Sequence, residues 1–325
     1  MEKIIISKSF DPYFNLAFEN LLFTHSKILE NTPILYLWRN SDVVVIGRFQ
    51  NPWKECNIQK LNDDNVFLMR RDTGGGAVFH DTDNLCFTFV GSTNDTNYRE
   101  KNSQFVCDAL ALLGFNAIPS GRNDLTIDDK KISGAAFREK DGKYIHHGTI
   151  LVGTDLTKLA NYLNPSKMKL MSKGISSVRS RVTKLQDLNS AITIEDVINS
   201  IIKTYCKKYL HDKEKISLAQ ETLLTEHTDL NTEYNRLKSW DWIYGKSPEF
   251  THSFEGRFDW GGIEINILVK NAIIEDISIH SDCLDIEFIT NLKTHFAGLL
   301  QTEYNLAKIQ DFLSKDFEDI ATLFK

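Results

Sequence analysis

The sequence predicts an α/β protein in two parts: a large part with mixed sheets flanked by helices, and a small C-terminal α+β domain. The chain has 325 residues, which is enough for about two domains. β-branched and aromatic runs alternate with segments of helical period over most of its length. After the stretch Trp240–Gly245, three further strand-like runs precede two helical segments. We therefore expect a larger domain at residues 1–244 and a smaller one at residues 245–325.

The composition is that of an ordinary globular protein, with 42% hydrophobic and 25% charged residues. No apolar run approaches the ~20 residues of a membrane helix, and the N-terminus lacks the features of a signal peptide. We therefore expect a cytoplasmic protein without a membrane partner. Five scattered cysteines predict neither a disulfide framework nor a zinc site, because none has metal-ligand spacing. The net charge of −6 gives no reason to expect nucleic acid as a partner.

The first elements are a helix and a pair of strands. Asp11 is suited to cap the helix, with Pro12 at its first position. Apolar residues at helical spacing then predict one buried face, made by Phe14, Ala17, Phe18, Leu21 and Leu22. The next two apolar runs, Ile34–Arg39 and Val43–Arg48, are separated by three polar residues and predict a hairpin.

Three consecutive glycines, Gly74–Gly76, lie between two further predicted strands, Val66–Arg71 and Leu85–Val90. Glycine loses more conformational entropy on ordering than any other residue, so the run indicates backbone that turns sharply or presses against a ligand. With Arg70 and Arg71 at its edge, the segment fits an anion-binding loop. An ordinary glycine-rich turn fits it equally well. Because the loop lies between strands, it is no P-loop.

The following elements are read from the same signals. A helix at Arg99–Leu113 ends at Gly114, and a capping box at Thr193–Asp196 opens another that runs to about Tyr209. Ile216–Lys238 is polar and favours helix. The remaining predictions are a turn at Asp128–Asp129, a strand at Thr149–Gly153, a helix from Thr154–Asp155 to Leu163, C-terminal strands at Phe250–Phe254, Gly262–Val269 and Ala272–His280, and helices at Leu284–Leu300 and Leu306–Lys325.

The stretch Ser166–Gln186 stands apart because it contains six cations and no acid. Its glycine, its serines and its weak periodicity predict a mobile basic loop. In a chain of net charge −6, such a run favours contact with an anion, although a solvated surface loop has the same composition. The six cations are Lys167, Lys169, Lys173, Arg179, Arg181 and Lys184.

Three polar blocks are candidates for one site: the glycine loop, the Gly121–Gly134 block and the basic loop. The chain lacks the P-loop, dinucleotide and nucleophile-elbow motifs, so a nucleotide would be held by backbone N–H groups, Arg and Lys. Lys131 is suited to a carboxylate or an α-phosphate, or is a surface lysine at a hairpin edge. Asn123 and Asp124 suit Mg²⁺, a ribose or simply a turn. His80 and His146–His147 are either bases or hydrogen-bonded structural residues.

At this point the motifs resemble the lipoate–protein ligase A family in its two-domain bacterial form. The resemblance covers nearly the whole chain. In the larger part it rests on Leu37–Asn40, Val44–Arg48, Gln50–Asn57, Arg70–Asp81, Ser120–Leu125, Lys131–Gly134, His146–Thr149, Leu159–Pro165 and Lys173–Val182. In the smaller part it rests on Trp240–Trp242, Tyr244–Gly245, Pro248, Phe250 and Trp260–Gly262.

The resemblance implies a fold like that of biotin protein ligases and a ligase that activates lipoate with ATP and Mg²⁺. Lipoyl-AMP forms, pyrophosphate leaves, and the lipoyl group passes to one lysine of a lipoyl domain. The implied partners are the lipoyl domains of 2-oxoacid dehydrogenase E2 subunits and the glycine-cleavage H protein. We expect a monomer. ATP and GTP, and lipoate and octanoate, fit the sequence pattern equally.

The resemblance also implies site residues. Lys131 is the catalytic residue that bridges the lipoyl carboxyl oxygen and the α-phosphate, and Asp124 is the candidate metal ligand. The expected contacts to ATP or the adenylate are Arg71, Gly76, Ala77, Val78, Phe79, Lys131, Lys173, Ser177 and Arg179. The expected contacts to lipoate are Trp38, Arg70, Gly75, Lys131 and His147. The candidates for an apolar tunnel are Leu16, Trp38, Val45 and Val78.

Three other functions compete with this interpretation. An acyltransferase of the same fold would take octanoyl from a carrier protein through a cysteine and would not use ATP. No cysteine lies near the Lys131 block in the sequence, and Cys86 lies in a very apolar strand. A transferase could instead use preformed lipoyl-AMP only. A non-catalytic nucleic-acid-binding module would use the basic loop and would show steep salt dependence.

Overall fold

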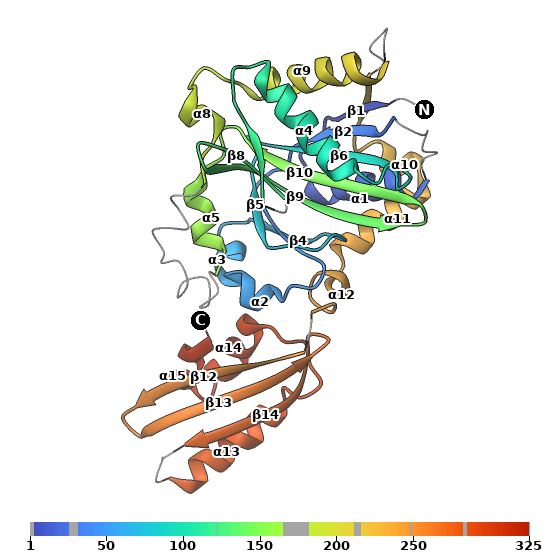
Figure 1. Ribbon diagram of the computed structural model, residues 1–325. Helices are drawn as coiled ribbons and strands as arrows, with labels where there is room; N and C mark the ends of the chain where they lie inside the picture. Colours follow the sequence, from blue (N-terminus) through green and yellow to red (C-terminus); the bar gives the residue numbers. More distant parts are fainter. Residues whose placement is uncertain are drawn as a thin grey trace.

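An eight-stranded mixed sheet forms the centre of the larger part of the molecule (Figure 1). The computed structural model describes residues 3–25, 32–121, 123–164, 182–210, 216–247, 249–281 and 285–324. The strands are β1 (Ile4–Ser7), β2 (Ile34–Trp38), β6 (Asn84–Ser92), β7 (Ile118–Ser120), β8 (Asp124–Ile127), β9 (Lys130–Lys140), β10 (Lys143–Leu151) and β11 (Ile216–Ala219). Their order is β11-β1-β2-β6-β10-β9-β8-β7, with β11, β1 and β2 parallel and the remaining pairs antiparallel.

A second, three-stranded sheet carries the glycine loop. It has the order β4-β3-β5, with β4 at Phe67–Arg70, β3 at Val43–Ile46 and β5 at Val78–His80. The predicted hairpin of the second and third strands is therefore wrong, because β2 belongs to the large sheet and β3 to this one. Both strands are apolar and buried at every position, so each requires partners on both edges and cover on both faces.

Helix α1 (Pro12–His25) lies between the two sheets (Figure 1). Asp11 Oδ1 accepts the backbone N–H groups of Tyr13 and Phe14, which confirms the predicted cap. The helix is buried over most of its circumference, and not on one face alone as predicted. Its polar residues Asn15 and Glu19 are consequently buried too, and both reach the functional region described below.

The opposite face of the large sheet is covered by α4 (Tyr98–Ala111) and α9 (Ile194–Tyr205), which form a second hydrophobic core with it (Figure 1). Both helices were predicted. Gly114, with φ of +85°, follows α4, and the capping box of Thr193 and Asp196 opens α9. A π-helical turn, η1 (Cys206–Leu210), extends α9.

The other helices of the larger part are short. They are α2 (Pro52–Glu55), α3 (Ile58–Asp63), α5 (Leu156–Tyr162), α8 (Leu185–Leu188), α10 (Leu223–Glu226), α11 (Thr228–Lys238) and α12 (Trp240–Ile243). The segment predicted to be helical from Ile216 begins instead with β11, since pairing with the edge of β1 outweighs its local preference.

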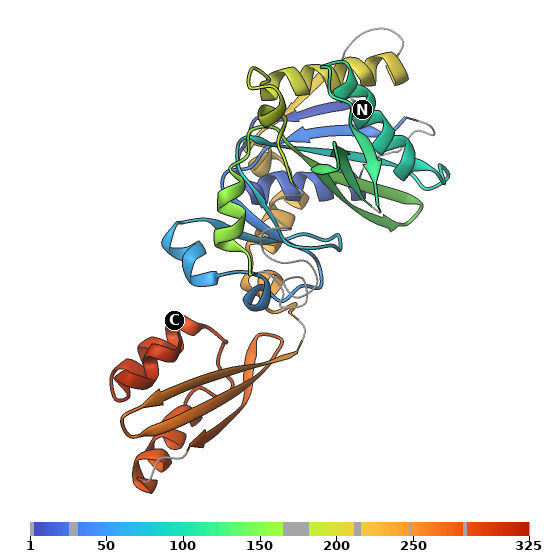
Figure 2. The ribbon, with the colours of Figure 1, turned by 60° about the vertical axis from the view of Figure 1, so that its left-hand side comes forward.

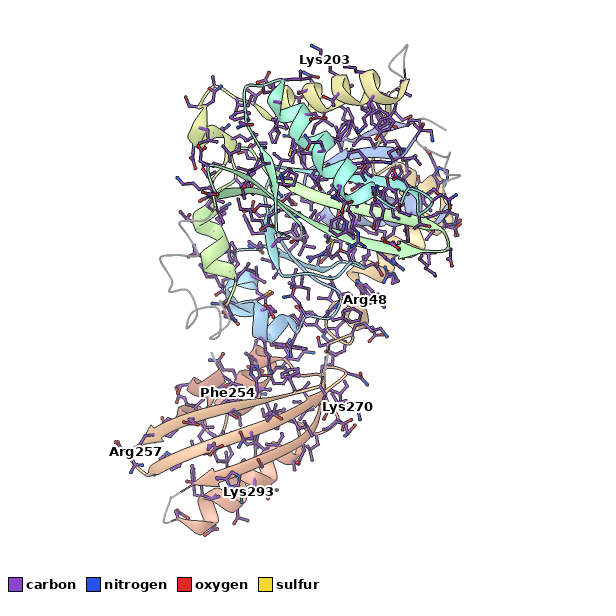
Figure 3. The ribbon with its side chains drawn as sticks, viewed as in Figure 1. Arg48, Lys203, Phe254, Arg257, Lys270 and Lys293 are labelled. Carbon is purple, nitrogen blue, oxygen red and sulfur yellow. The ribbon has the colours of Figure 1, made fainter. Side chains whose placement is uncertain are left out.

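The C-terminal part has its own three-stranded antiparallel sheet and hydrophobic core, and it lies apart from the two sheets above (Figures 1 and 2). Its elements are β12 (Phe250–Phe258), β13 (Gly261–Lys270), β14 (Ile273–Ser281), α13 (Ile286–Ala297), α14 (Leu306–Ser314), α15 (Glu318–Ala321) and the 3₁₀ turn η2 (Thr322–Phe324). Figure 3 places Arg257 at the far end of β12, whereas Arg48 lies on the larger part near the junction.

Aromatic side chains of the larger part, Trp53 above all, join the two parts. Trp53 of α2 packs into the C-terminal core, with its ring centroid 5.3 Å from that of Phe250 and 5.1 Å from that of Tyr304. Among the described residues, no helix is both long and apolar enough to cross a bilayer. The domain boundary at residues 244 and 245 stays a prediction.

Candidate active site

The glycine loop is folded around the side chain of Arg71. Its guanidinium donates from Nη2 to the carbonyls of Gly74 and Gly76, at 2.7 and 2.9 Å, and from Nη1 to that of Val45 at 3.1 Å. Nε donates to Thr73 Oγ1 at 3.0 Å. Burial lowers the pKa of Arg71 to about 10, so the group is still charged at neutral pH. These hydrogen bonds fix the curved shape of the loop around Arg71. One Nη1–H of Arg71 has no acceptor within the described residues.

Glycine is required at position 47, directly after β3, where the backbone lies against the glycine loop. A Cβ at Gly47 would lie 2.1 Å from the carbonyl oxygen of Gly75, which real Cβ atoms do not tolerate. Gly75 itself has φ of +98°, in the region that favours glycine. Close approach of two backbones therefore explains both residues, and the sequence signal of a pressed backbone is confirmed for the loop.

Arg70 has a different role from the one expected. Its side chain is fully buried and donates to the carbonyls of Trp242, Ile243 and Gln50, at distances of 2.6 to 3.1 Å. All three guanidinium nitrogens are occupied by acceptors of the chain. It points away from the cavity described below, so we correct the expectation that Arg70 contacts lipoate. Adjacent residues on a strand face opposite sides, which is why only Arg71 faces the loop.

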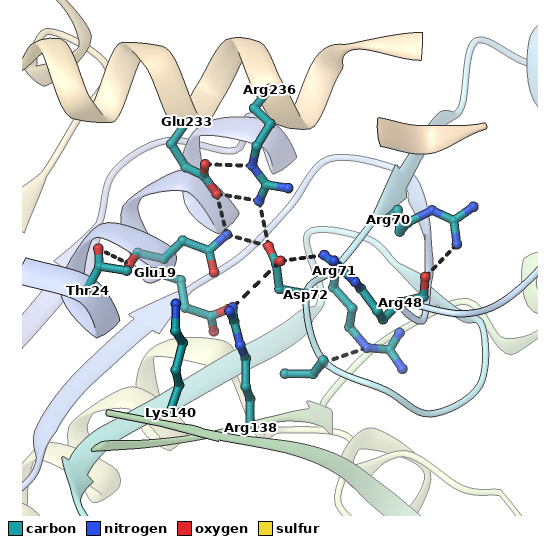
Figure 4. A network of polar contacts seen from close by, with 12 residues as sticks. Glu19, Thr24, Arg48, Arg70, Arg71, Asp72, Arg138, Lys140, Glu233 and Arg236 are labelled. Carbon is teal, nitrogen blue, oxygen red and sulfur yellow. Dashed lines mark hydrogen bonds and ion pairs between the residues drawn. The ribbon is translucent and has the colours of Figure 1, made fainter. Parts of the chain in front are cut away.

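The outer side of the loop is fixed by Asp72 (Figure 4). Its carboxylate pairs with Arg48 at 2.9 Å, Arg236 at 2.6 Å and Arg138 at 3.6 Å, and only 10% of the Asp72 side chain is exposed. Arg236 also pairs with Glu233 at 2.6 Å. These residues come from β9, α11 and the loops around β3 and β4, so the network ties the glycine loop to both sheets.

Lys131 lies on β9 and pairs with Asp124 of β8, with Nζ 2.7 Å from Oδ1. About a third of each side chain is exposed. A Cβ at Gly134 would lie 2.8 Å from Nζ, so the absence of a side chain there lets the ammonium lie across the sheet. The backbone of Lys131 forms a bridge with Val182 and accepts from Thr183 N at 2.9 Å. Lys131 therefore lies next to the β8–β9 turn, as a hairpin-edge lysine would, and its side chain also lines the cavity described below.

A cavity of about 320 Å³ joins the glycine loop to Lys131. Its lining includes the polar side chains of Lys131, Asn123 and Thr149. It also includes the apolar side chains of Leu16, Trp38, Val45 and Val78, all four of the tunnel candidates. Other predicted site residues on its wall are Arg71, Gly75, Gly76, Ala77 and His147. The volume is typical of a small-molecule site, and the lining suits a ligand with an anionic head and an apolar tail.

A chain of buried polar contacts connects the wall of this cavity with the glycine loop. His147 Nδ1 lies 2.9 Å from Glu19 Oε1, and its Nε2 lies 2.8 Å from Thr73 Oγ1. Thr88 donates to Glu19 at 2.6 Å and accepts the indole N–H of Trp38 at 3.0 Å. All five side chains are under 10% exposed. Sequence reasoning missed Glu19, although it is the one carboxylate of helix α1, and that is the signal that points to it.

Three predicted site residues lie outside the described residues: Lys173, Ser177 and Arg179. Phe79 is described, but its side chain lies on the face of β5 opposite the cavity and packs on Tyr162, with ring centroids 5.6 Å apart. No group of three or more His, Cys, Asp or Glu residues that would hold a metal occurs in the described ranges. The assignment of Asp124 to a metal stays a prediction.

Cys86 is closer to the site than its sequence context indicated. It lines the cavity, 3.6 Å from Nδ1 of His80, which lines it as well. Burial raises the pKa of the Cys86 thiol well above its ordinary value and lowers the pKa of His80 to about 3. The pair is therefore a neutral thiol beside a neutral imidazole, which lacks the thiolate that a nucleophile needs.

A second cavity, of about 390 Å³, lies where Trp53 and Tyr244 meet Tyr304 of the C-terminal part. Its walls contain aromatic, amide and aliphatic side chains, and none of the described residues that line it is charged. A carboxylate or phosphate substrate requires a cation, so the Lys131 cavity is the better candidate for the active site.

Comparisons with known proteins agree with this geometry. Residues 11–206 match the model of the lipoyl protein ligase A/B catalytic domain, and residues 247–322 match that of the bacterial lipoate protein ligase C-terminus. The chain is 41% identical to the lipoate-protein ligase A of Psychrobacter cryohalolentis over 98% of its own length and 94% of the relative's. The chain belongs to the lipoate–protein ligase A family.

Solved structures of the same family align over most of the chain. The structure of P. falciparum LipL1 in complex with lipoate covers 98% of this chain and 97% of its own, with 33% identity and a TM-score of 0.63. A bipartite lipoate protein ligase from Thermoplasma acidophilum, solved with its E2 lipoyl domain, covers 75% of this chain and 96% of its own, with 28% identity and a TM-score of 0.64. A lipoate-protein ligase A bound with ATP covers 75% and 98%, with 27% identity and a TM-score of 0.63. The predicted family, mixed α/β fold and ligase activity are thereby confirmed.

Proposed function

We propose that this ligase activates lipoate and transfers it within the single cavity that joins Lys131 to the glycine loop. The observation that carries the proposal is the lining of that cavity, which combines the cation of Lys131 with several apolar side chains. Relatives have been solved with lipoate and with ATP. A carboxylate head beside Lys131 and an aliphatic tail between Leu16, Trp38 and Val45 match this lining.

The reaction runs in two steps. A carboxylate oxygen of lipoate attacks the α-phosphorus of ATP, the bond to the β-phosphate oxygen breaks, and pyrophosphate leaves. An acceptor lysine then attacks the acyl carbon of lipoyl-AMP, AMP leaves, and the amine loses a proton. The first step brings two anions together, so it requires a cation at their junction. Lys131 is placed to supply it, and removing such a preorganised charge typically costs ~3–4 kcal/mol of barrier.

The nucleotide would lie along the glycine loop. Backbone from Gly76 to Phe79 and the remaining Nη1–H of Arg71 are the groups we assign to the phosphate or the adenylate. Val182 and Thr183, near the C-terminal end of the basic stretch Ser166–Gln186, pair with the backbone of Lys131. This attachment supports contacts from Lys173, Ser177 and Arg179 to the adenylate, in a segment that would exclude water from the mixed anhydride.

Mg²⁺ would enter with the polyphosphate of ATP and neutralise its charge. Magnesium sites of this kind use one or two protein carboxylates together with substrate phosphates. Asp124 fits that pattern, because its carboxylate lies beside Lys131 and is about one-third exposed. We therefore assign Asp124 as the protein carboxylate nearest the metal.

The acceptor we propose is a lysine of a lipoyl domain, in E2 subunits of 2-oxoacid dehydrogenases or in the glycine-cleavage H protein. The Thermoplasma acidophilum relative was solved with its E2 lipoyl domain, which supports the E2 assignment. We propose that the protein acts as a monomer in the cytoplasm. Cys56, Cys86 and Cys107 are buried free thiols, which is compatible with a reducing compartment.

The contact of Cys86 with His80 is the observation that favours one alternative, an acyltransferase that passes octanoyl through a cysteine. The protonation state and the partners of the two side chains argue against this alternative. The thiol is buried with a raised pKa, and the imidazole nitrogen it faces also contacts Asn40 Nδ2 at 3.2 Å. We therefore expect Cys86→Ala to retain ATP-dependent activity and no acyl-cysteine to accumulate.

A mass shift on an isolated lipoyl domain that depends on lipoate, ATP and Mg²⁺ tests the function. In the same assay, Lys131→Ala should release AMP about a hundred- to a thousandfold more slowly, with an unchanged melting temperature. Lys130→Ala is the matched control, since Lys130 is the exposed neighbour on β9 and should behave like the unmodified protein. Near-normal AMP release by Lys131→Ala would refute its role. Octanoyl transfer without ATP through an acyl-Cys86 would refute the ligase mechanism.

A further inference from the structure

His80 lies at the apolar part of the cavity without an assigned function. It belongs to β5, is 4% exposed, and shares the cavity wall with Trp38, Val45 and Cys86. Polar side chains in such surroundings usually have a hydrogen-bond partner for each donor, because an unsatisfied buried donor costs ~1–3 kcal/mol. His80 Nε2 is buried and has no partner within the described residues.

A relay of asparagines fixes which nitrogen of His80 carries the proton. Asn15 Nδ2 donates to the backbone carbonyls of Ser9 and Arg39, at 3.1 and 2.8 Å, which sets the orientation of the Asn15 amide. The same Nδ2 lies 3.0 Å from Asn40 Oδ1, so the Nδ2 of Asn40 faces His80 Nδ1 at 3.2 Å. His80 Nδ1 therefore accepts a hydrogen bond.

The orphaned nitrogen is consequently a donor. Burial lowers the pKa of His80 to about 3, so the ring is neutral at physiological pH and carries one proton. Since Nδ1 is the acceptor, that proton is on Nε2. The Trp38 ring centroid lies 6.1 Å from that of His80, too far for the indole face to serve as a close acceptor. His80, a residue of the cavity wall, thus carries a buried neutral N–H donor without a partner in the described residues.

We propose that His80 is a specificity-determining residue whose Nε2–H donates a hydrogen bond to a dithiolane sulfur of lipoate. The inference rests on the proposed placement of the lipoate carboxylate beside Lys131, which directs the tail of the substrate to the other part of the cavity. Sulfur is a weak acceptor, whereas the terminal carbons of octanoate accept no hydrogen bond. Octanoate leaves the donor unsatisfied, so the site selects for a sulfur-bearing acyl chain.

Two substitutions test the proposal in the full-length protein. The measured quantity is the ratio of kcat/KM for lipoate to that for octanoate, from pyrophosphate release. His80→Leu removes the donor and should lower this ratio about tenfold. His80→Gln retains an amide N–H near the position of Nε2 and should stay within threefold of the unmodified ratio. A purely structural role would reduce both substrates in proportion, and an unchanged ratio in His80→Leu overturns the proposal.

A measurement on the unmodified protein keeps the proposal testable if either variant fails to fold. With ¹⁵N-labelled histidine, lipoate should move the His80 Nε2–H proton resonance downfield, and octanoate should not. Equal shifts with the two acids would overturn the proposal. Lys131→Ala separates this proposal from the proposed function. If Lys131→Ala retains activity, the placement of the lipoate carboxylate is wrong. If Lys131→Ala loses activity while His80→Leu leaves the ratio for lipoate over octanoate unchanged, only the role of His80 is wrong.

Discussion

At the scale of single residues, two adjacent arginines have opposite roles. Arg71 turns into the glycine loop, whereas Arg70 turns into the protein and binds carbonyls near the end of the larger part. Composition cannot separate them, since both precede the glycines and both are buried. Only the alternation of side chains along β4 and its continuation decides which guanidinium meets the cavity.

Arg70→Met should therefore destabilise the protein without impairing lipoate binding. The substitution leaves several buried carbonyls without donors, so we expect the free energy of unfolding in urea to fall by about 3 kcal/mol. Arg39→Met is a suitable control, because Arg39 makes an exposed hydrogen bond to Thr82 O and a contact with the ring of Phe10, and binds no buried carbonyl in the described residues. The KM for lipoate, measured well below the melting temperature, should change less than threefold. A raised KM with unchanged stability would restore the original expectation of a lipoate contact.

Within the site, the sequence identified most of the cavity wall correctly. The glycines, Lys131, Trp38 and His147 all lie on it. Glu19 and Thr88 were missed, because their importance comes from a position between two sheets that no local pattern reports. Cys86 was judged remote because spacing in the chain says nothing about which strands become neighbours.

At the scale of elements, the glycine loop depends on the strand below it. Strand β3 ends just before Gly47, and a side chain there would strike the carbonyl of Gly75. The loop and the end of β3 therefore form one unit. The predicted hairpin of β2 and β3 is wrong because β3 is the central strand of the small sheet that presents the loop.

Gly47→Ala should displace the loop while leaving the rest of the fold intact. A shift of about 1 Å at a reacting centre costs roughly a hundredfold in rate, so we expect that loss in lipoate-dependent pyrophosphate release. Gly74→Ala is the matched variant, since a Cβ there has open space and an unexceptional φ. It should keep at least half of the activity. Equal activities of the two variants would show that the close approach has no catalytic consequence.

At the scale of the whole molecule, two buried histidines link stability to pH. His80 faces the cavity, and His146 lies between Phe87, Phe89 and Phe137. Burial lowers both pKa values to about 3, whereas the unfolded value is about 6.5. Between these values the unfolded state binds more protons. Their contribution is therefore fully present above pH 6.5 and is lost as the pH falls toward 3.

The free energy of unfolding should thus fall by up to ~1.4 kcal/mol per pH unit for each of these histidines, or about 2 kcal/mol each at pH 5. His146→Phe places an apolar ring among the phenylalanines and should remove the contribution of His146 to the dependence of the unfolding free energy on pH. Urea unfolding at pH 7, 6 and 5 gives the slope for both proteins. Identical slopes would mean that folding does not lower the pKa of His146.

The assembly of the two parts also belongs to this scale. Trp53, from the larger part, lies in the core of the C-terminal part, so the two hydrophobic cores are not separated cleanly in the sequence. Arg70 adds a second link through Ser247 Oγ, which lies beyond the expected boundary. The change in sequence pattern near Trp240–Gly245 indicated where the two parts divide. It did not indicate which side chains cross the junction.

The sequence alone determined the family, because three rare motifs occur together, and it singled out the glycine loop and Lys131 as candidates for the site. It also predicted the caps at Asp11 and Thr193 and the longer helices, since these depend on neighbouring residues. Tertiary structure decided the pairing of β2 and β3, the opposite roles of Arg70 and Arg71, and the place of Glu19. It also left His80 Nε2–H as a donor in an apolar cavity. These features depend on contacts between residues far apart in the chain, where burial and hydrogen bonding, and not local preference, set the energy.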